Sequence, residues 1–181
     1  MHNSDLVWLW IDCEMTGLDP QNDQLLEVAC IVTDKDLIAK HEGPDMVVGH
    51  NQSVLEQMDE WCRSHHKASG LWQSVLDSNL NVTQVEDAII AFLEGLNKDK
   101  RNWVLAGNSV HHDKAFLQRW MPKLMSYCHY RILDVSSIAM IMNGWYDCGT
   151  YEKKQTHRAL DDINESIGQL AFYQAFLDEK L

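Results

Sequence analysis

Two apolar stretches near the N-terminus have the composition of neighbouring strands in a sheet. Residues 6–13 and 25–33 are rich in β-branched and aromatic side chains. Residues 17–23 separate them and contain glycine, aspartate and proline, which favour tight turns. The pattern therefore predicts two adjacent strands joined by a short connection.

The apolar stretches that follow are shorter, and the spacing between apolar residues then changes. Residues 37–41 and 46–48 predict two short strands, and the glycine and proline within residues 42–45 separate them. From Gln52 onward, apolar residues recur at helical rather than alternating spacing. The first quarter of the chain is therefore expected to be mostly strand.

A helix in the middle of the chain has both a start signal and an apolar stripe. Thr83 and Glu86 have the spacing of a capping box, in which two side chains satisfy the first free amide groups of a helix. The stripe that follows ends near residue 97 and consists of Val85, Ala88, Ile89, Phe92, Leu93 and Leu96. Together the two signals predict a helix over residues 83–97.

The second half of the chain alternates between strand and helix patterns. The expected elements are a strand at 103–107, a helix at 112–120 that Pro122 helps to end, a strand at 132–134, and helices at 136–142 and 158–177. The last helix is expected to bury Leu160, Ile163, Ile167, Leu170 and Leu177. This order predicts a single α/β domain over residues 1–181, with a mixed β-sheet flanked by α-helices.

Length and composition narrow the class of protein. The chain has 181 residues, 45% of them hydrophobic, which suits one core. No apolar run approaches the roughly 20 residues that span a bilayer, so no membrane association is expected. The five cysteines are odd in number, widely spaced and without a Cys-x-x-Cys pair, which favours a reducing compartment. We expect a cytoplasmic protein, or a mitochondrial one if a leader has been removed.

The net charge of −12 bears on the kind of partner. Proteins that follow a long nucleic acid normally present basic surface to its phosphates. An acidic chain fits a short substrate held by a few specific contacts better, so no stable complex with long nucleic acid is expected.

Asp12 and Glu14 follow directly on the first apolar stretch. Residues two apart on a strand point to the same side, so both carboxylates share one small patch. Two like charges beside a buried strand repel each other, and a divalent cation between them relieves the repulsion. The alternative is a hairpin end with solvated acids.

His157 and Asp162 add an imidazole and a carboxylate far along the chain. Five residues apart on one helix, they would point about 140° away from each other. They can converge only if His157 precedes or caps the helix, where a neutral imidazole could accept a proton from water. The alternative is a helix N-terminus that carries acids because its dipole favours them.

Asp113 begins a predicted helix just beyond a predicted strand end, where α/β sheets tend to place their sites. Its alternative is a plain helix cap. His111 and His112 raise the idea of zinc, but adjacent ligands chelate poorly and no thiolate partner is evident. A structural calcium site is disfavoured because the chain has no compact calcium loop.

The order of these motifs resembles the histidine branch of the DEDD exonuclease superfamily, since a tyrosine-branch member would have tyrosine in place of Arg158. Five segments carry a closer similarity: WIDCEMTGLD at 10–19, Trp61 with HKASGL at 66–71, GNS at 107–109, YRILDVS at 130–136 and HRALDD at 157–162. Through them the chain resembles the oligoribonuclease family nearly end to end. The resemblance implies a ribonuclease-H-like fold.

The resemblance also implies a chemistry. The acids Asp12, Glu14, Asp113 and Asp162 would hold two Mg²⁺ or Mn²⁺ ions, and His157 would deprotonate the attacking water. The expected enzyme is a metal-dependent 3′→5′ exoribonuclease that releases nucleoside 5′-monophosphates. The residue set for this chemistry is complete in the chain.

Further residues bear, by resemblance, on substrate length. Leu18 and Trp61 would form a wedge that stacks on the terminal base, unless both simply fill the core. His66 would contact the substrate backbone. Four residues would close around the 5′-phosphate and favour dinucleotides: Ser109, Arg131, Ser136 and Ser137.

The resemblance implies a homodimer, in which Tyr130 reaches the neighbouring subunit's site. One departure is that residues 138–149 lack the basic helix face usual in the family. Two other functions stay open, an exonuclease that trims the 3′ ends of longer RNA or DNA, and a catalytically silent module that binds nucleotides.

Overall fold

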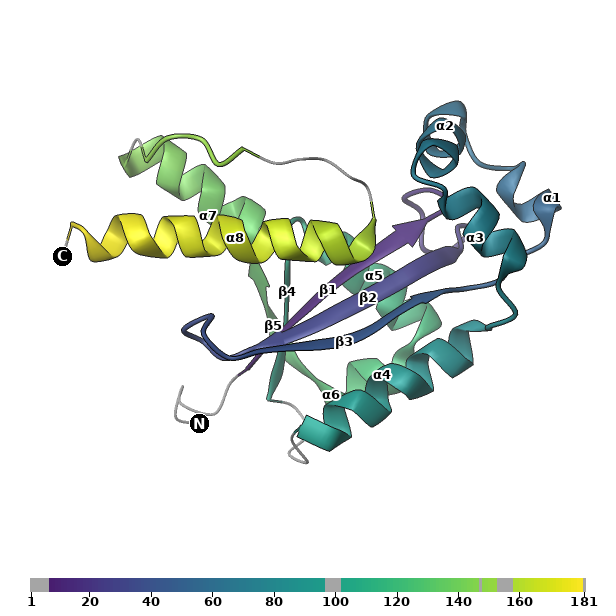
Figure 1. Cartoon of the computed structure of the whole chain (residues 1–181), viewed down its shortest axis with the longest axis horizontal. Coiled ribbons are helices and arrows are strands. Elements are labelled where there is room, and N and C mark those ends of the chain that lie inside the picture. The colour runs from purple at the N-terminus through teal and green to yellow at the C-terminus, as the bar shows by residue number, and fades with distance from the viewer. Residues whose placement is uncertain (1–6, 97–101, 147, 153–157, 181) are drawn as a thin grey trace.

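The computed structural model describes residues 7–96, 102–146, 148–152 and 158–180. Its centre is a five-stranded sheet with the order β3-β2-β1-β4-β5 (Figure 1). β1, β2 and β3 pair antiparallel, whereas β4 and β5 run parallel to β1. The strands are β1 Val7–Met15, β2 Leu25–Thr33, β3 Lys40–Val47, β4 Trp103–Gly107 and β5 Cys128–Asp134. The expected mixed sheet is confirmed.

Helices cover the sheet and one end of it. They are α1 Gln52–Leu55, α2 Glu60–Ala68, α3 Leu71–Asp77, α4 Val82–Leu96, α5 His111–Trp120, α6 Pro122–Tyr127, α7 Val135–Ile141 and α8 Ala159–Asp178, and a π-helical turn, η2, spans Met142–Tyr146. Within the described ranges, none of these helices is long and apolar enough to cross a membrane.

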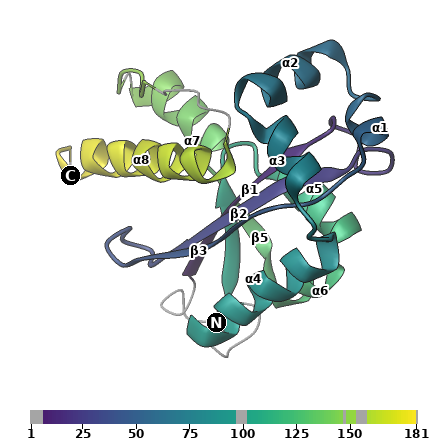
Figure 2. The same ribbon diagram turned by 45° about the vertical axis from the view of Figure 1, so that its right-hand side comes forward.

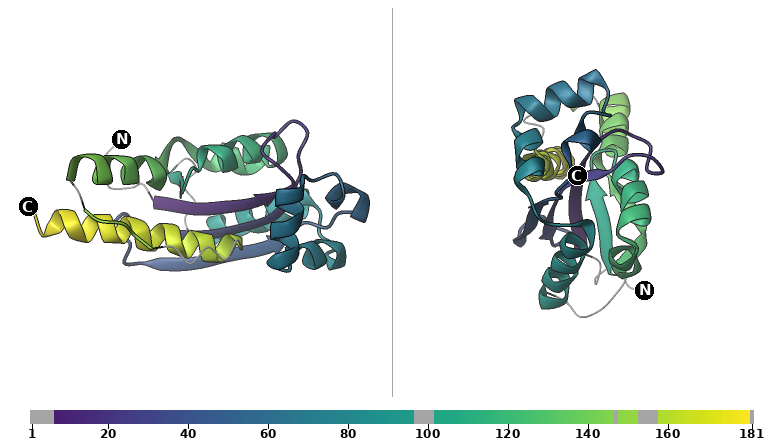
Figure 3. Two further views of the ribbon diagram at one scale, coloured as in Figure 1. Left: turned by 90° about the horizontal axis from the view of Figure 1, so that it is seen from above. Right: turned by 90° about the vertical axis from the view of Figure 1, so that its right-hand side faces the viewer.

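The two faces of the sheet pack against different helices because successive strand residues point to opposite sides. Leu9 and Ile11 of β1 pack with apolar residues of α4, α5 and α6, whereas Trp10 packs with α7 and α8. In the view of Figure 1, α8 lies above the strands and α4 and α6 lie below them. Seen from above, β1 runs between α8 and α5 (Figure 3, left). The layered architecture buries both faces of β2, all nine residues of which are buried.

A smaller cluster closes the end of the sheet where β1 finishes. Helices α1, α2 and α3 gather there (Figure 2). Leu26 of β2 packs with apolar residues of these helices, namely Leu55, Met58, Cys62, Leu71 and Val75. This arrangement places α2 beside the exit of β1, where the acidic residues lie.

The third strand differs from the sequence-based expectation. Instead of two short strands broken at residues 42–45, the chain forms one strand, β3, through Gly43 and Pro44. Asp45 pairs with Ala29 and Glu42 pairs with Ile31, and the pairing shifts between them. Gly43 and Pro44 therefore fall at an irregularity in the ladder. Because β3 is an edge strand, the missing amide of proline is tolerated there.

The start of α4 also differs from the expected capping box. The reciprocal bonds join Asn81 and Gln84, each backbone amide donating to the other's side-chain oxygen at 3.0 Å. Glu86 is buried instead, and its carboxylate accepts from the backbone amide of Leu124 at 3.0 Å. The capping box therefore begins two residues before the expected position.

Three further boundaries of helices and strands differ from the sequence-based prediction. Pro122 does follow the end of α5, but it also opens α6, a helix that the pattern did not predict. β5 begins at Cys128 rather than at residue 132, and α7 continues into the π-helical turn. The last helix begins at Ala159, with Arg158 as its N-cap, close to the predicted start.

Candidate active site

The exit of β1 brings three carboxylates together. Asp12 and Glu14 lie on the side of β1 that faces α8, since Trp10, two residues earlier, packs there. Asp162 lies in the first turn of α8. Ligand oxygens of these three half-buried residues lie within 4.8 Å of one another. Clustered carboxylate oxygens are the donors that hard divalent cations such as Mg²⁺ and Mn²⁺ prefer, so the residues fit such an ion.

Asp113 approaches the same place from α5. It is 6% exposed and lies in the first turn of that helix. Its Oδ1 accepts a hydrogen bond from the backbone amide of Cys13 at 2.9 Å, which ties α5 to β1 between Asp12 and Glu14. Asp113 is not part of the trio within 4.8 Å, but it lines the same cleft.

The electrostatics of this cluster are unfavourable without a cation. Burial, followed by the charge of Asp113, raises the pKa of Asp12 well above its ordinary value. Burial and the nearby charge of Asp162 raise the pKa of Glu14 to about 8. Burial raises the pKa of Asp113 to about 7 against the opposing effect of its hydrogen bonds. A bound cation would favour the ionised forms of all these groups.

The cluster opens into a cleft of about 510 Å³. Its walls come from β1, the following turn, α2 and α5, and they include Met15, Gly17, Leu18, Asp59, Trp61, Cys62, His66, Asn108, Ser109 and His112. Leu18 is 72% exposed and Trp61 is 61% exposed, so neither fills the core. The Trp61 ring stacks on His65 with a centroid separation of 3.9 Å. Exposed apolar side chains at the mouth of an acidic cleft suit stacking on a base.

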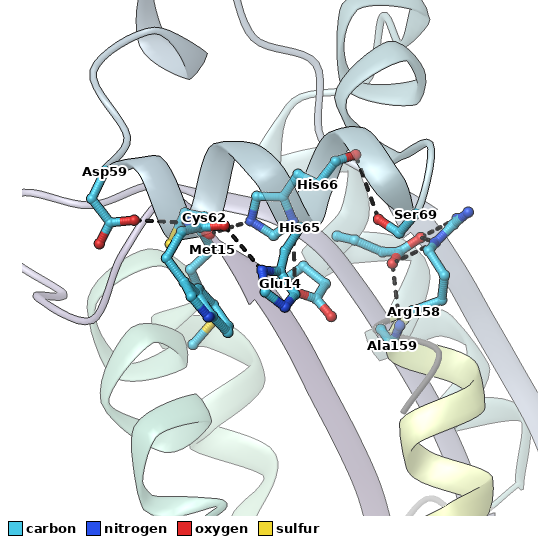
Figure 4. Close-up of polar contacts among 11 residues, drawn as sticks. Glu14, Met15, Asp59, Cys62, His65, His66, Ser69, Arg158 and Ala159 are labelled. Atoms are coloured by element: carbon cyan, nitrogen blue, oxygen red, sulfur yellow. Dashed lines mark hydrogen bonds and ion pairs between the residues drawn. The ribbon is translucent and has the colours of Figure 1, made fainter. Parts of the chain in front are cut away.

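His66 reaches the acids from α2 (Figure 4). It is buried, and its Nε2 lies 2.9 Å from the backbone carbonyl oxygen of Met15. Since a carbonyl only accepts, Nε2 carries the proton of this hydrogen bond. The Nδ1 atom lies 4.0 Å from a carboxylate oxygen of Glu14. His66 therefore lies against the acidic cluster and also lines the cleft.

The predicted phosphate-binding serines lie together around Asp134. The backbone amide of Ser109 donates to Asp134 at 2.8 Å and to the Ser136 hydroxyl at 3.0 Å. The Ser137 hydroxyl donates to Asp134 at 2.6 Å. Ser109 lines the cleft, and Ser136 adjoins it through a hydroxyl contact of 3.2 Å.

Tyr130 and Arg131 lie elsewhere. Neither lines the acidic cleft. Tyr130 is 73% exposed, lies with Lys114 and His129 along a separate groove, and has the Arg131 guanidinium 5.4 Å from its ring centroid. The structure of one chain thus brings Ser109, Ser136 and Ser137 together but leaves Arg131 apart.

His157 lies outside the described residues. Sequence analysis requires His157 to precede or cap the last helix. The structure begins α8 at Ala159, with extended backbone at Arg158. Its role as a proton acceptor stays a prediction.

Two residues that sequence analysis left without a role also line the cleft. His112 lies one residue before Asp113, and Asn108 follows β4. The Asn108 amide donates to the Ser166 hydroxyl of α8 at 2.8 Å, while its oxygen accepts from Ser136 at 3.1 Å. A polar turn at the carboxyl end of a parallel strand was the available signal.

Comparisons with known proteins show which family the chain belongs to and which known structures have a similar fold. Residues 9–170 match the family model described as exonuclease, RNase_T. Exonuclease I of E. coli in complex with a dT13 oligonucleotide has a similar fold, with a TM-score of 0.69 and 15% identity. The match covers 97% of this chain and 43% of exonuclease I, so the chain spans less than half of that protein. The fold and the family match define a hydrolase of the exonuclease class with a ribonuclease-H-like fold.

More similar relatives narrow the class. The probable oligoribonuclease of Drosophila melanogaster is 44% identical over 178 residues, which cover 97% of this chain and 83% of the relative. The mitochondrial oligoribonuclease of Homo sapiens is 43% identical over 170 residues, which cover 92% of this chain and 71% of the relative. The chain belongs to the oligoribonuclease family.

Proposed function

We propose that this protein is a metal-dependent 3′→5′ exoribonuclease that degrades very short RNAs, chiefly dinucleotides, to nucleoside 5′-monophosphates. The observation that carries the proposal is the cluster of Asp12, Glu14 and Asp162 at an open cleft with exposed apolar side chains at its mouth. Family membership supports the reaction, and the cleft and net charge support the short substrate.

Four acids would hold the metal. The oxygens of Asp12, Glu14 and Asp162 are close enough to share a cation, and Asp113 lines the same cleft. When bound, two Mg²⁺ or Mn²⁺ ions would supply positive charge that stabilises the attacking and leaving oxygens of phosphoryl transfer. The raised pKa values of Glu14 and Asp113 are what such a site is expected to show before it is filled.

The remaining chemistry falls to side chains around these acids. His157 accepts the proton of the attacking water, and the 3′-terminal nucleotide departs as a 5′-monophosphate. His66 lies beside Glu14 and offers an imidazole to the substrate backbone. Leu18 and Trp61 stack on the terminal base, which holds a substrate that has few phosphates to grip.

The preference for dinucleotides depends on the polar residues around Ser109, which lines the cleft. Ser109 and its neighbours Ser136 and Ser137 offer hydroxyl groups that can close around a 5′-phosphate. A third nucleotide would collide with such a cap. Arg131 joins this group in the proposal as a charge-assisted donor, although its guanidinium lies over Tyr130 in the single chain.

We also infer a homodimer. Tyr130 is exposed and lines a groove separate from its own chain's cleft, so it is available to contact a second subunit. Exposed apolar residues on and after α7 would be covered in such an assembly, namely Met140, Ile141, Trp145 and Tyr146.

The five cysteines are free and buried, which favours a reducing compartment such as the cytoplasm or, as for the named human relative, the mitochondrion.

The test is a time course on one mixed pool of 5′-phosphorylated RNAs, two to seven nucleotides long. The pool is incubated with Mg²⁺, with Mn²⁺ and with EDTA, and in parallel with Asp162→Ala. We expect fast metal-dependent loss of the dinucleotide, slower loss of the longer RNAs, and no turnover by the variant.

Other outcomes select the rivals. Equal or faster loss of the longer RNAs would favour an exonuclease that trims 3′ ends. No cleavage of any length by the wild-type protein would favour a silent nucleotide-binding module. Sedimentation as a monomer at the assay concentration would overturn the homodimer and the role of Tyr130.

A further inference from the structure

A fifth carboxylate lies next to the proposed metal site and is held by an arginine. Glu27 is fully buried in β2, and its partner across the β1–β2 ladder is Glu14. Residues directly opposite each other in an antiparallel pair point to the same face, so Glu27 faces α8 as Glu14 does. We propose that Glu27 and Arg158 form a positioning pair that sets the place of Asp162 in the metal site.

The contacts between the two residues leave little freedom. The Nε atom of Arg158 donates to both carboxylate oxygens of Glu27, at 3.0 and 3.1 Å, and its Nη2 also donates to Oε1. The backbone amide of Ala159 donates to Oε2 at 3.2 Å. Figure 4 shows Arg158 and Ala159 at the start of α8. One buried carboxylate thus holds both the N-cap and the first residue of the helix.

These bonds connect β2 to Asp162 through the helix. The backbone amide of Asp162 donates to the carbonyl oxygen of Arg158 at 3.0 Å, which closes the first turn of α8. Glu27 therefore fixes the turn that carries Asp162, while Glu14 projects from the neighbouring strand. Because the two strands are hydrogen-bonded, the pair fixes the separation between Asp162 and the acids of β1.

The pair also keeps Glu27 from acting as a ligand. The Arg158 guanidinium donates to both of its oxygens and the Ala159 amide donates to one, so these lone pairs are already used by hydrogen bonds. Glu27 and Arg158 touch neither water nor substrate in this scheme, and they act through Asp162 and Glu14.

This inference rests on the metal-dependent function proposed above. Its test is a titration with Mn²⁺ alone, in which free Mn²⁺ is counted by electron paramagnetic resonance. The main variant is Glu27→Gln/Arg158→Met, which removes the Glu27–Arg158 ion pair without changing the net charge. We expect its dissociation constant for Mn²⁺ to rise by about ten-fold or more, the usual effect of losing a group that orients ligands.

The chain offers a matched control. Lys123 and Asp87 form an exposed ion pair at 3.2 Å between α6 and α4. The double substitution Lys123→Met/Asp87→Asn changes charge in the same way but lies on the other face of the sheet, so its Mn²⁺ affinity is expected to stay within two-fold of the wild type. Arg158→Lys keeps the positive charge but loses the forked guanidinium group. Its dissociation constant for Mn²⁺ is expected to lie between those of the main variant and the control.

A second measurement separates positioning from simple loss of stability. Dinucleotide cleavage by the main variant is expected to recover when Mn²⁺ is raised above the new dissociation constant, with KM for the dinucleotide unchanged. Unchanged Mn²⁺ affinity in the main variant, despite a lower melting temperature, would show that the pair is only structural and overturn the proposal. If that variant does not unfold cooperatively, Arg158→Lys decides, and wild-type affinity there overturns it equally. Failure of the wild-type protein itself to bind Mn²⁺ would instead contradict the proposed function.

Discussion

The two faces of β1 bury different chemistry as the strand approaches its end. On the face that packs on α4 and α5, Leu9, Ile11 and Cys13 stay apolar throughout. On the face that packs on α8, Trp10 is followed by Asp12 and then Glu14. One face of β1 therefore belongs to an apolar core, where burial stabilises the fold. The other face carries a cluster of carboxylates, where burial is unfavourable.

The difference assigns separate tasks to the two faces. Both faces bury apolar surface, which stabilises the fold, but near the end of β1 only the first face stays apolar. The second face gathers carboxylates whose raised pKa values record their mutual repulsion and desolvation. Substitutions on the two faces should therefore separate stability from turnover.

The largest expected effect is on turnover. Asp12→Asn keeps the size of the side chain but removes a carboxylate from the cluster, so the rate of dinucleotide cleavage is expected to fall by about 1,000-fold. The melting temperature in EDTA should stay the same or rise, because the substitution removes a carboxyl group whose burial among other acids is unfavourable. Cleavage assays and calorimetry on the same preparation check both. If Asp12→Asn kept more than a tenth of the wild-type activity, Asp12 would not be part of the catalytic site.

The opposite face should show the reverse. Leu9→Ala deletes a fully buried side chain, and the free energy of unfolding is expected to fall by about 2 to 5 kcal/mol. Turnover per folded molecule should stay within two-fold of wild type. Ile38→Ala, at a residue that is 84% exposed, is the control and should change stability by less than about 0.5 kcal/mol. A large loss of turnover in Leu9→Ala would mean that the two faces are not independent.

Next in size is the effect of pH on the metal-free protein. Between its ordinary pKa of 4.5 and the folded value of about 8, Glu14 keeps its proton in the folded protein and loses it in the unfolded chain. Rising pH therefore favours unfolding, and Asp113, with a folded pKa of about 7, acts in the same direction. In EDTA, stability should fall by on the order of a few kcal/mol from pH 5 to pH 8.

Denaturant titrations at several pH values measure this slope. Saturating Mn²⁺ should remove most of it, because the cation favours the ionised carboxylates. Glu14→Gln should flatten the slope in EDTA. A wild-type protein that is equally stable at pH 5 and pH 8 without metal would show that these acids are not strained by burial.

The smallest effect concerns the mouth of the cleft. Trp61→Ala removes a stacking surface that is worth about 1 to 3 kcal/mol per base, so KM for the dinucleotide should rise by about 5- to 150-fold. Stability should hardly change, since Trp61 is 61% exposed. Steady-state kinetics at saturating metal measure KM and kcat separately. A fall in kcat at unchanged KM would place Trp61 in the chemistry rather than in binding.

The apolar pattern was sufficient for elements that are either buried throughout or have one regular apolar face. β2 was predicted residue for residue because all nine positions are buried, and α4 was predicted within a residue at each end. β3 was wrongly divided because Gly43 and Pro44 are normally breakers, and the sequence does not show that they lie at an irregularity on an edge strand. The π-helical turn after α7 has no periodic signal at all.

The candidate site was predictable where it depends on local spacing. Asp12 and Glu14 share a side of one strand, which spacing alone predicts. Glu27 was overlooked because its environment depends on Arg158, 131 residues away in the sequence. The available signal was a single acid inside a nine-residue apolar strand, since a buried charge requires a partner.

We propose that the acids at the exit of β1 lie together because they hold divalent cations. Anomalous diffraction from crystals soaked in Mn²⁺ locates bound cations on the protein. We expect an anomalous peak bonded to oxygens of Asp12, Glu14 and Asp162. Mn²⁺ bound only elsewhere on the protein, with these three carboxylates still clustered, would contradict it.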